Sequence, residues 1–222
     1  MEQSRSRDII TVVITAVFVI GYMGLTNSGL FSLTNLLNIH SDTAFYIDQT
    51  IGVWILLIPT VIFMFRDKES LIDIGFMRGK IFLQLLVGLV LGIVSIIIFT
   101  IISVITGVEF FMGLRSMSFD FGSITLTLFH ALLTWALVEE IIYRGHLYKK
   151  VKNITNSMWA AVIITSLIFS AKHMFSFDNL HIFLPMAFIF GLLCCICREK
   201  IKHCSLLSLI IAHSVNNMLM YT

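Results

Sequence analysis

The stretch Leu133-Thr-Trp-Ala-Leu-Val-Glu-Glu-Ile-Ile-Tyr-Arg-Gly145 places two adjacent glutamates, Glu139 and Glu140, near the end of an otherwise apolar segment of membrane length. A charged side chain at the centre of a bilayer costs about 2.5–3.5 kcal/mol even on lenient insertion scales. Two such residues in succession are hard to explain by packing alone. We therefore interpret the pair as part of a functional site within a membrane.

The apolar character extends along the whole chain of 222 residues, which is 58% hydrophobic and 13% charged, with a mean hydropathy of +0.95. A soluble domain carries about 25% charged residues. Apolar windows of about the length of a membrane helix, the sixth of them short, cover residues 9–26, 46–65, 82–106, 123–143, 157–175, 182–197 and 204–221. They exceed the length of barrel strands and lack strand alternation. We predict an all-α, polytopic transmembrane bundle of about seven helices, forming one integral-membrane domain over residues 1–222.

The basic residues lie on alternate connections between these windows. They precede the first window and follow the second, fourth and sixth; Arg115 and Lys172 are the exceptions. Basic residues collect on the cytoplasmic side of membrane proteins. This pattern predicts a cytoplasmic N-terminus, seven crossings and a C-terminus on the opposite side.

The two glutamates differ in their helical neighbours. Glu140 and Arg144 are four residues apart, so they face the same side of a helix and are expected to pair. Glu139 is rotated by about 100° and has no obvious local partner. This predicts an anchored carboxylate beside a free one that is available as a general base. The alternative is an ordinary ion pair at the cytoplasmic end of a helix.

Two later windows carry polar residues at helical spacing. Phe169 and His173 are four apart near the end of the fifth window, beside the unusual Lys172. His213 and Asn217 are four apart in the seventh, with Asn216 as the neighbouring alternative to Asn217. Alone, His173 is compatible with an interfacial residue, and the pair in the seventh window with a hydrogen bond between helices.

Together, the three patterns resemble those of the CPBP family, the CAAX proteases and bacteriocin-processing enzymes, also called the Abi family. The matching residues are Glu139, Glu140 and Arg144 (Glu-Glu-x-x-x-Arg), Phe169 and His173 (Phe-x-x-x-His), and His213 and Asn217 (His-x-x-x-Asn). The order and spacing of the motifs carry the resemblance, which covers a catalytic core of about 123–222. A weaker similarity to the family lies upstream, in the sequence Leu-Ile-Asp-Ile-Gly-Phe at residues 71–76.

The resemblance implies an intramembrane endopeptidase, a glutamic peptide hydrolase. In this scheme Glu139 and His173 position and deprotonate a water that attacks a peptide carbonyl. His213 and Asn217 donate hydrogen bonds to the developing oxyanion. Glu140 and Arg144 hold Glu139 in place.

The predicted depths of the candidate site residues in the membrane differ too much for them to share one site. Counted from the predicted cytoplasmic ends, the depths of Glu139, His173 and His213 differ by roughly 10–15 Å at about 1.5 Å per residue. Tilted helices, or helices that begin at different heights, would reconcile them.

Three alternatives remain open from the sequence. A metal-dependent protease would use Glu139, His173 and His213 as ligands of a divalent ion such as zinc; we expect no cofactor, because Asn217 suits an oxyanion role better than a zinc site. A bacteriocin-immunity or scaffolding protein would bind a partner without cutting it. A small transporter would use Glu139, Lys172 and His213 as an ion path, although no internal repeat supports it.

The short chain favours a bacterial cell membrane. There we expect the substrate to be a membrane-associated peptide or protein, such as a peptide pheromone or a bacteriocin precursor. The lipid bilayer is the other expected partner, and we expect no nucleic acid.

Overall fold

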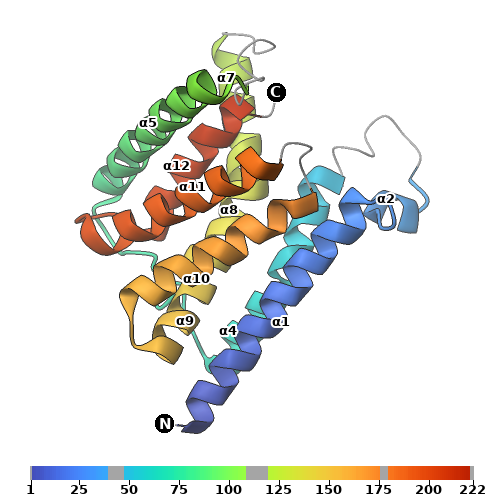
Figure 1. Cartoon of the computed structure of the whole chain (residues 1–222), viewed down its shortest axis with the longest axis vertical. Helices are drawn as coiled ribbons and strands as arrows, with labels where there is room; N and C mark the ends of the chain where they lie inside the picture. Colours follow the sequence, from blue (N-terminus) through green and yellow to red (C-terminus); the bar gives the residue numbers. More distant parts are fainter. Residues whose placement is uncertain (1, 40–47, 109–119, 176–179, 221–222) are drawn as a thin grey trace.

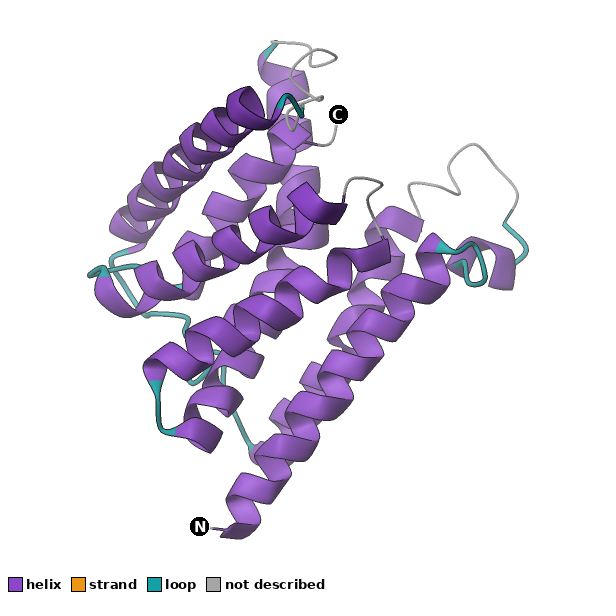
Figure 2. Ribbon diagram, viewed as in Figure 1, coloured by secondary structure: helices purple, strands orange, loops and turns teal. Residues whose placement is uncertain are grey.

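The computed structural model describes residues 2–39, 48–108, 120–175 and 180–220. Within these ranges every regular element is helical and none is a strand (Figures 1 and 2). The α-helices are α1 (Glu2–Asn27), α2 (Leu33–Leu36), α4 (Ile58–Asp67), α5 (Ile81–Thr106), α7 (Phe121–Ala131), α8 (Leu137–Glu139), α9 (Tyr148–Thr155), α10 (Met158–Ala171), α11 (Leu180–Lys200) and α12 (Leu206–Met220). The π-helical segments are η1 (Asp48–Gly52), η3 (Leu132–Ala136) and η4 (Glu140–Leu147), and the 3₁₀ segments are η2 (Ile55–Leu57) and η5 (Lys172–Phe175).

The helices are those of an integral membrane protein. Six described segments are long and apolar enough to cross a membrane: 4–27, 50–67, 81–106, 121–155, 158–175 and 180–200. A seventh, shorter apolar helix covers residues 206–218. The predicted helical membrane bundle is therefore confirmed, and the seventh predicted window corresponds to this shorter helix.

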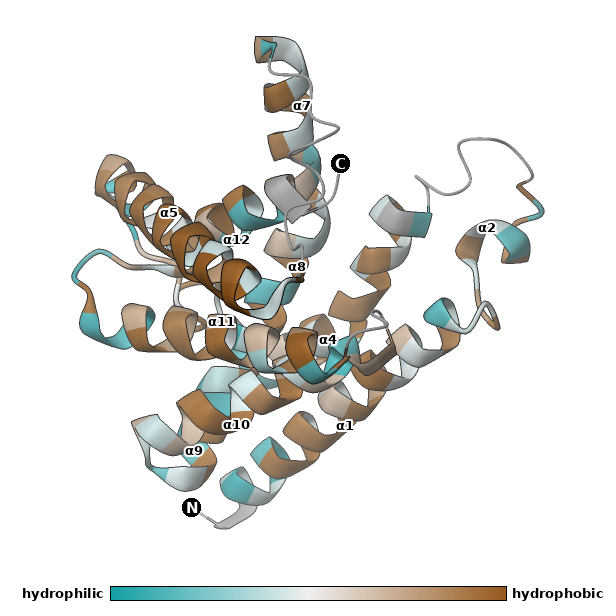
Figure 3. Cartoon of the chain, turned by 45° about the horizontal axis from the view of Figure 1, so that its top comes forward, coloured by the Kyte–Doolittle hydropathy of each residue, from teal (hydrophilic) through white to brown (hydrophobic). Residues whose placement is uncertain are grey.

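The surface of the bundle is apolar, as expected for helices that face lipid. Figure 3 shows hydrophobic residues along most of α5 and α1. On α5, Phe82 and Val104 expose 75% and 79% of their surface. In water such a surface would be a liability, whereas lipid solvates it without cost. In Figure 1, α1 begins at one end of the long axis and α12 ends near the other.

Small residues on α5 allow it to pack closely against α12. A Cβ added at Gly88 would lie 2.6 Å from the carbonyl oxygen of Ser208, and one at Gly92 would lie 3.1 Å from Val215. Small residues four apart are the usual means of close helix approach in membranes, where no hydrophobic effect drives helices together. This contact fixes the position of α12, which carries His213.

A buried ion-pair cluster, which we call the charged clamp, ties three helices together at the end where the chain begins. The Lys150 ammonium on α9 lies 3.1 Å from Asp8 on α1, 2.5 Å from Asp67 on α4 and 2.9 Å from Glu69 just after α4. Lys150 is only 3% exposed, so it depends on these carboxylates for solvation. The clamp fixes the end of the long helix that carries the two glutamates.

The close contact between α5 and α12 gives a stability prediction. Gly88→Ala should destabilise the protein by about 1–3 kcal/mol, because its methyl group overlaps a backbone carbonyl. Gly21→Ala on α1 is the matched control: nothing lies within 4 Å of its added Cβ, so it should be neutral or stabilise by about 0.5–1 kcal/mol. Thermal unfolding of both variants in detergent tests this; equal melting temperatures would contradict the packing described.

The clamp gives a second prediction, on pH. Burial alone would raise the pKa of Glu69, but hydrogen bonds from His146, Lys150 and Lys149 outweigh it and lower the pKa from 4.5 to about 2. Because the folded pKa is depressed, the stabilisation is complete above about pH 4.5 and is lost as the pH falls toward 2. Wild type should therefore unfold at a higher temperature than Glu69→Gln at neutral pH. The difference should shrink through this acidic range; a difference independent of pH would show that Glu69 acts by shape alone.

Candidate active site

The two glutamates lie where the long helical segment 121–155 departs from regular α-helix. The short α8 ends at Glu139, and the π-helical segments η3 and η4 precede and follow it. Wider π turns are frequent at functional sites because they redirect side chains. Glu139 is 2% exposed and Glu140 is fully buried. Both carboxylates therefore point into the bundle.

Glu140 is shared by two donors. Arg144 donates to its Oε1 at 2.9 Å, which confirms the predicted pair four residues apart. His213 Nδ1 lies 2.8 Å from the same oxygen. A carboxylate that also accepts from a guanidinium has no proton to give, so the ring donates through Nδ1. Glu140 thereby fixes the tautomer and orientation of His213.

Phe169 holds Arg144 from the other side. The Arg144 guanidinium carbon lies 3.9 Å from the centre of the Phe169 ring and 5.5 Å from that of Phe190. Cation–π contacts of this kind are strongest when both partners are shielded from water. The phenylalanine of the Phe-x-x-x-His pattern is thus a support for the arginine of the first pattern, which the spacing alone did not reveal.

Glu139 is not free, contrary to the sequence prediction. The Lys172 ammonium, at the junction of α10 and η5, forms an ion pair with Glu139 Oε1. Its other oxygen, Oε2, lies 3.8 Å from His213 Nε2. Lys172 also lies over the rings of Trp135, at 5.3 Å, and Phe169, at 5.2 Å. The partner was missed because it comes from another helix; the signal was a single lysine in an apolar window.

His173 and His213 line one small cavity. His173 packs edge-on against Phe169, with ring centres 5.3 Å apart, and His213 packs against Phe190 at 4.9 Å. The cavity has a volume of about 60 Å³, which is room for a few water molecules. Its lining consists of Phe99, Phe169, His173, Phe183, Met186, Ala187, Phe190, His213, Asn216 and Asn217.

The two asparagines of α12 have different surroundings. The Asn216 amide donates to Ser95 Oγ on α5 at 3.0 Å, and Ser95 in turn donates to the Gly92 carbonyl. Asn216 therefore links α12 to the small-residue face of α5. Asn217 also lines the cavity and is 7% exposed. Of the two, Asn217 has no such tie to α5.

The disagreement in depth disappears because the helices begin at different heights. Glu139 and His173 lie at equal sequence distances on either side of the turn between Thr155 and Ser157, so the antiparallel helices bring them level. The start of α12 is buried, since the Leu206 amide donates to the Gly75 carbonyl at 2.9 Å and Leu206 has no exposed surface. His213 therefore needs fewer helical residues to reach the same level.

The residues predicted as ligands in the metal-dependent alternative are Glu139, His173 and His213. Among the described residues, no group of three or more His, Cys, Asp or Glu side chains is arranged to hold a metal ion. Within the proposed set, Glu139 Oε2 and His213 Nε2 face each other at 3.8 Å. The other atoms, Glu139 Oε1 and His213 Nδ1, are engaged by Lys172 and Glu140.

The family comparison matches the part of the chain that holds this cluster. Residues 121–219 match a family model described as type II CAAX prenyl endopeptidase, Rce1-like. Comparisons with curated proteins and with solved structures gave no match. The match covers the segments with both glutamates, Arg144, His173 and His213, in the order that the motifs predicted. The resemblance to the CPBP family is therefore confirmed over residues 121–219, where the chain is similar to the Rce1-like endopeptidases.

Proposed function

We propose that this protein is an intramembrane endopeptidase in which Glu139 activates the attacking water. The observation that carries the proposal is the position of Glu139: a buried carboxylate held between the Lys172 ammonium and His213, whose ring lines a cavity large enough for water. A carboxylate held in a dry site with an oriented imidazole opposite it suits general-base catalysis. The family match supports the reaction class.

The reaction needs one proton acceptor and one stabilised oxygen. Glu139, together with His173, removes a proton from water as its oxygen bonds to the peptide carbonyl carbon. The carbonyl oxygen becomes an oxyanion, which His213 and Asn217 stabilise. The proton then passes to the peptide nitrogen, the carbon–nitrogen bond breaks, and a carboxylic acid and an amine leave.

The role of His213 sets a requirement on its protonation. Its Nδ1 already donates to Glu140, so donation to an oxyanion must come from Nε2 and requires the doubly protonated ring. Two carboxylates, Glu139 and Glu140, and two cations, Lys172 and Arg144, leave the cluster neutral before that proton is added. Protonated His213 would add one positive charge to the cluster, and the negative charge of the oxyanion would neutralise it.

The cavity constrains how a substrate binds. A volume of about 60 Å³ holds the attacking water but not a peptide. Side chains of α11 that line it, among them Phe183, Met186 and Ala187, must therefore move when a peptide enters. Pro185 lies among them and removes one hydrogen bond of α11, which weakens the helix there. We propose a membrane-associated peptide or small protein as substrate, in a bacterial membrane with the N-terminus of the enzyme in the cytoplasm.

The first functional prediction concerns Glu139. Glu139→Gln keeps the shape of the side chain but cannot accept a proton, so proteolysis should fall by at least about 100-fold. The measurement compares new protein N-termini in membranes of cells that express wild type or the variant at equal levels. Glu199→Gln, which removes a carboxylate paired with Lys152 away from the site, is the control and should cleave normally.

Two results, one from this experiment and one from purified protein, would change the assigned function. If no terminus depends on Glu139, and the variant keeps the phenotype of wild type, the protein acts by binding, as an immunity or scaffolding protein does. If a strong chelator abolishes cleavage by purified wild type and zinc restores it, the reaction is metal-dependent. The proposed mechanism expects cleavage to persist in the chelator.

The second functional prediction concerns Lys172. Lys172→Met leaves the buried Glu139 carboxylate without its cation and free to turn, so cleavage should fall by about 10–100-fold. Lys172→Arg keeps the charge and should retain more activity than Lys172→Met. The measurement is the rate at which wild type and each of the two variants cleave a peptide that wild type cleaves. Equal rates for wild type and Lys172→Met would show that the ion pair has no part in the reaction.

A further inference from the structure

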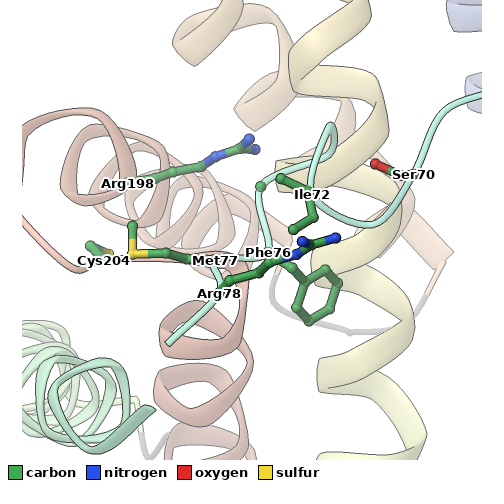
Figure 4. Close-up of a pocket in the computed structure, with 8 residues that line it drawn as sticks. Ser70, Ile72, Phe76, Met77, Arg78, Arg198 and Cys204 are labelled. Carbon is green, nitrogen blue, oxygen red and sulfur yellow. The ribbon is translucent and has the colours of Figure 1, made fainter. Parts of the chain in front are cut away.

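A second and much larger cleft lies away from the glutamates. It has a volume of about 680 Å³, within the usual range for small-molecule sites. The loop between α4 and α5, the end of α11 and Cys204 just before α12 line this open cleft (Figure 4). Its lining consists of Ser70, Ile72, Gly75, Phe76, Met77, Arg78, Arg198 and Cys204. None of these residues has a role in the proposed proteolysis.

Arg198 is the most unusual residue of this cleft. Its guanidinium packs flat against Gly75, where an added Cβ would lie 2.4 Å from a guanidinium nitrogen. Its carbon lies 5.1 Å from the centre of the Tyr148 ring. One nitrogen, Nη1, is buried without a hydrogen-bond partner. A buried N–H donor without an acceptor is costly, and an anion that reached this nitrogen would remove that cost.

The charge around the cleft is positive. Arg78 is the second guanidinium of the lining, and it is exposed. The nearest acidic residues in the sequence already have partners: Glu199 pairs with Lys152 at 2.8 Å, and Asp73 accepts hydrogen bonds from Ser70. In the described parts of the chain, neither Arg78 nor Arg198 forms a salt bridge. The two arginines are therefore available to a ligand.

The loop that forms one wall is firmly held. Asp73 accepts hydrogen bonds from the backbone and hydroxyl of Ser70 at 2.8 and 2.6 Å. Gln84 donates to the carbonyls of Met77 and Gly79. Ile74 is fully buried beneath the loop. The wall of the cleft is therefore fixed by the fold and is not a loose segment.

Exposed apolar side chains lie in the lining of the cleft and next to it: Ile72 and Met77 line it, and Leu71, Ile81 and Phe82 are near them in the sequence. Leu71, Ile72, Met77, Ile81 and Phe82 each expose between 43% and 75% of their surface. They lie on the loop and at the first turn of α5, where that helix begins its apolar, membrane-length run. A soluble phosphate has no use for such a rim, whereas the acyl chains of a lipid would cover it.

We propose that this cleft binds the phosphate of an anionic membrane lipid, with Arg198 and Arg78 contacting the phosphate oxygens and the apolar rim contacting the acyl chains. Guanidinium groups match phosphate geometry through paired N–H donors. Basic pockets between membrane helices at a membrane surface are a recurrent form of lipid headgroup site. The lipid would also hold the end of α11 against the loop.

The test is lipid binding to the full chain in neutral detergent, measured by native mass spectrometry and by thermal stabilisation. Phosphatidylglycerol should bind and raise the melting temperature, and phosphatidylcholine and inorganic phosphate should do so at least about tenfold more weakly. Arg198→Gln should weaken phosphatidylglycerol binding about tenfold. Arg78→Gln, at an exposed position, should weaken it about threefold.

Lys200→Gln is the control, because it removes the same charge from the same helix end without lining the cleft. It should change binding by less than about twofold. The proposal fails if Lys200→Gln weakens binding as much as Arg198→Gln, or if neither arginine variant weakens it. It also fails if inorganic phosphate binds as well as the lipid, which would identify a soluble ligand. Should Arg198→Gln not fold, Arg78→Gln alone decides between these outcomes.

Discussion

The pairing of buried charges governs this structure. Glu139, Glu140, Arg144 and Lys172 are all at most 2% exposed, within helices whose outer faces meet lipid. Removing one partner of a buried pair typically costs about 3–5 kcal/mol, which is a large part of the roughly 5–15 kcal/mol by which a folded protein is stable. The four charges must therefore be brought together from two helical segments, with His213 on a third. Folding the bundle and assembling the site are in this sense one event.

Contacts elsewhere in the bundle hold these buried charges next to one another. The small residues of α5 let α12 approach until His213 reaches Glu140, and the Asn216 amide secures the same contact through Ser95. At the other end, the charged clamp fixes α9 against α1 and α4. Phe169 and Phe190 then fill the space beside Arg144 and exclude water from its charge. A dry, preorganised cluster is the arrangement in which charge stabilises a reaction most strongly.

The site and the Arg198 cleft use charge in different ways. In the site each carboxylate has a cation, so the four charges cancel. In the cleft, neither Arg198 nor Arg78 pairs with a carboxylate of the described residues. The first arrangement suits a reaction in which charge appears only briefly. The second suits a ligand that brings its own negative charge.

Much of this protein follows from its sequence alone. The long apolar windows required membrane helices, because backbone groups in lipid must be satisfied within each segment. The Glu140–Arg144 pair followed from helical spacing, and the order of three short motifs indicated the family. Local patterns of this kind depend only on residues within one or two turns of each other.

The tertiary structure decided what spacing cannot express. It placed Lys172 on Glu139, set Phe169 beneath Arg144, and separated Asn217 from Asn216 by their surroundings. It also removed the apparent mismatch in depth, because helices of unequal length begin at different heights. These features depend on which helices become neighbours and at what level. That choice is made by close packing and by the need to pair buried charges, which no single segment contains.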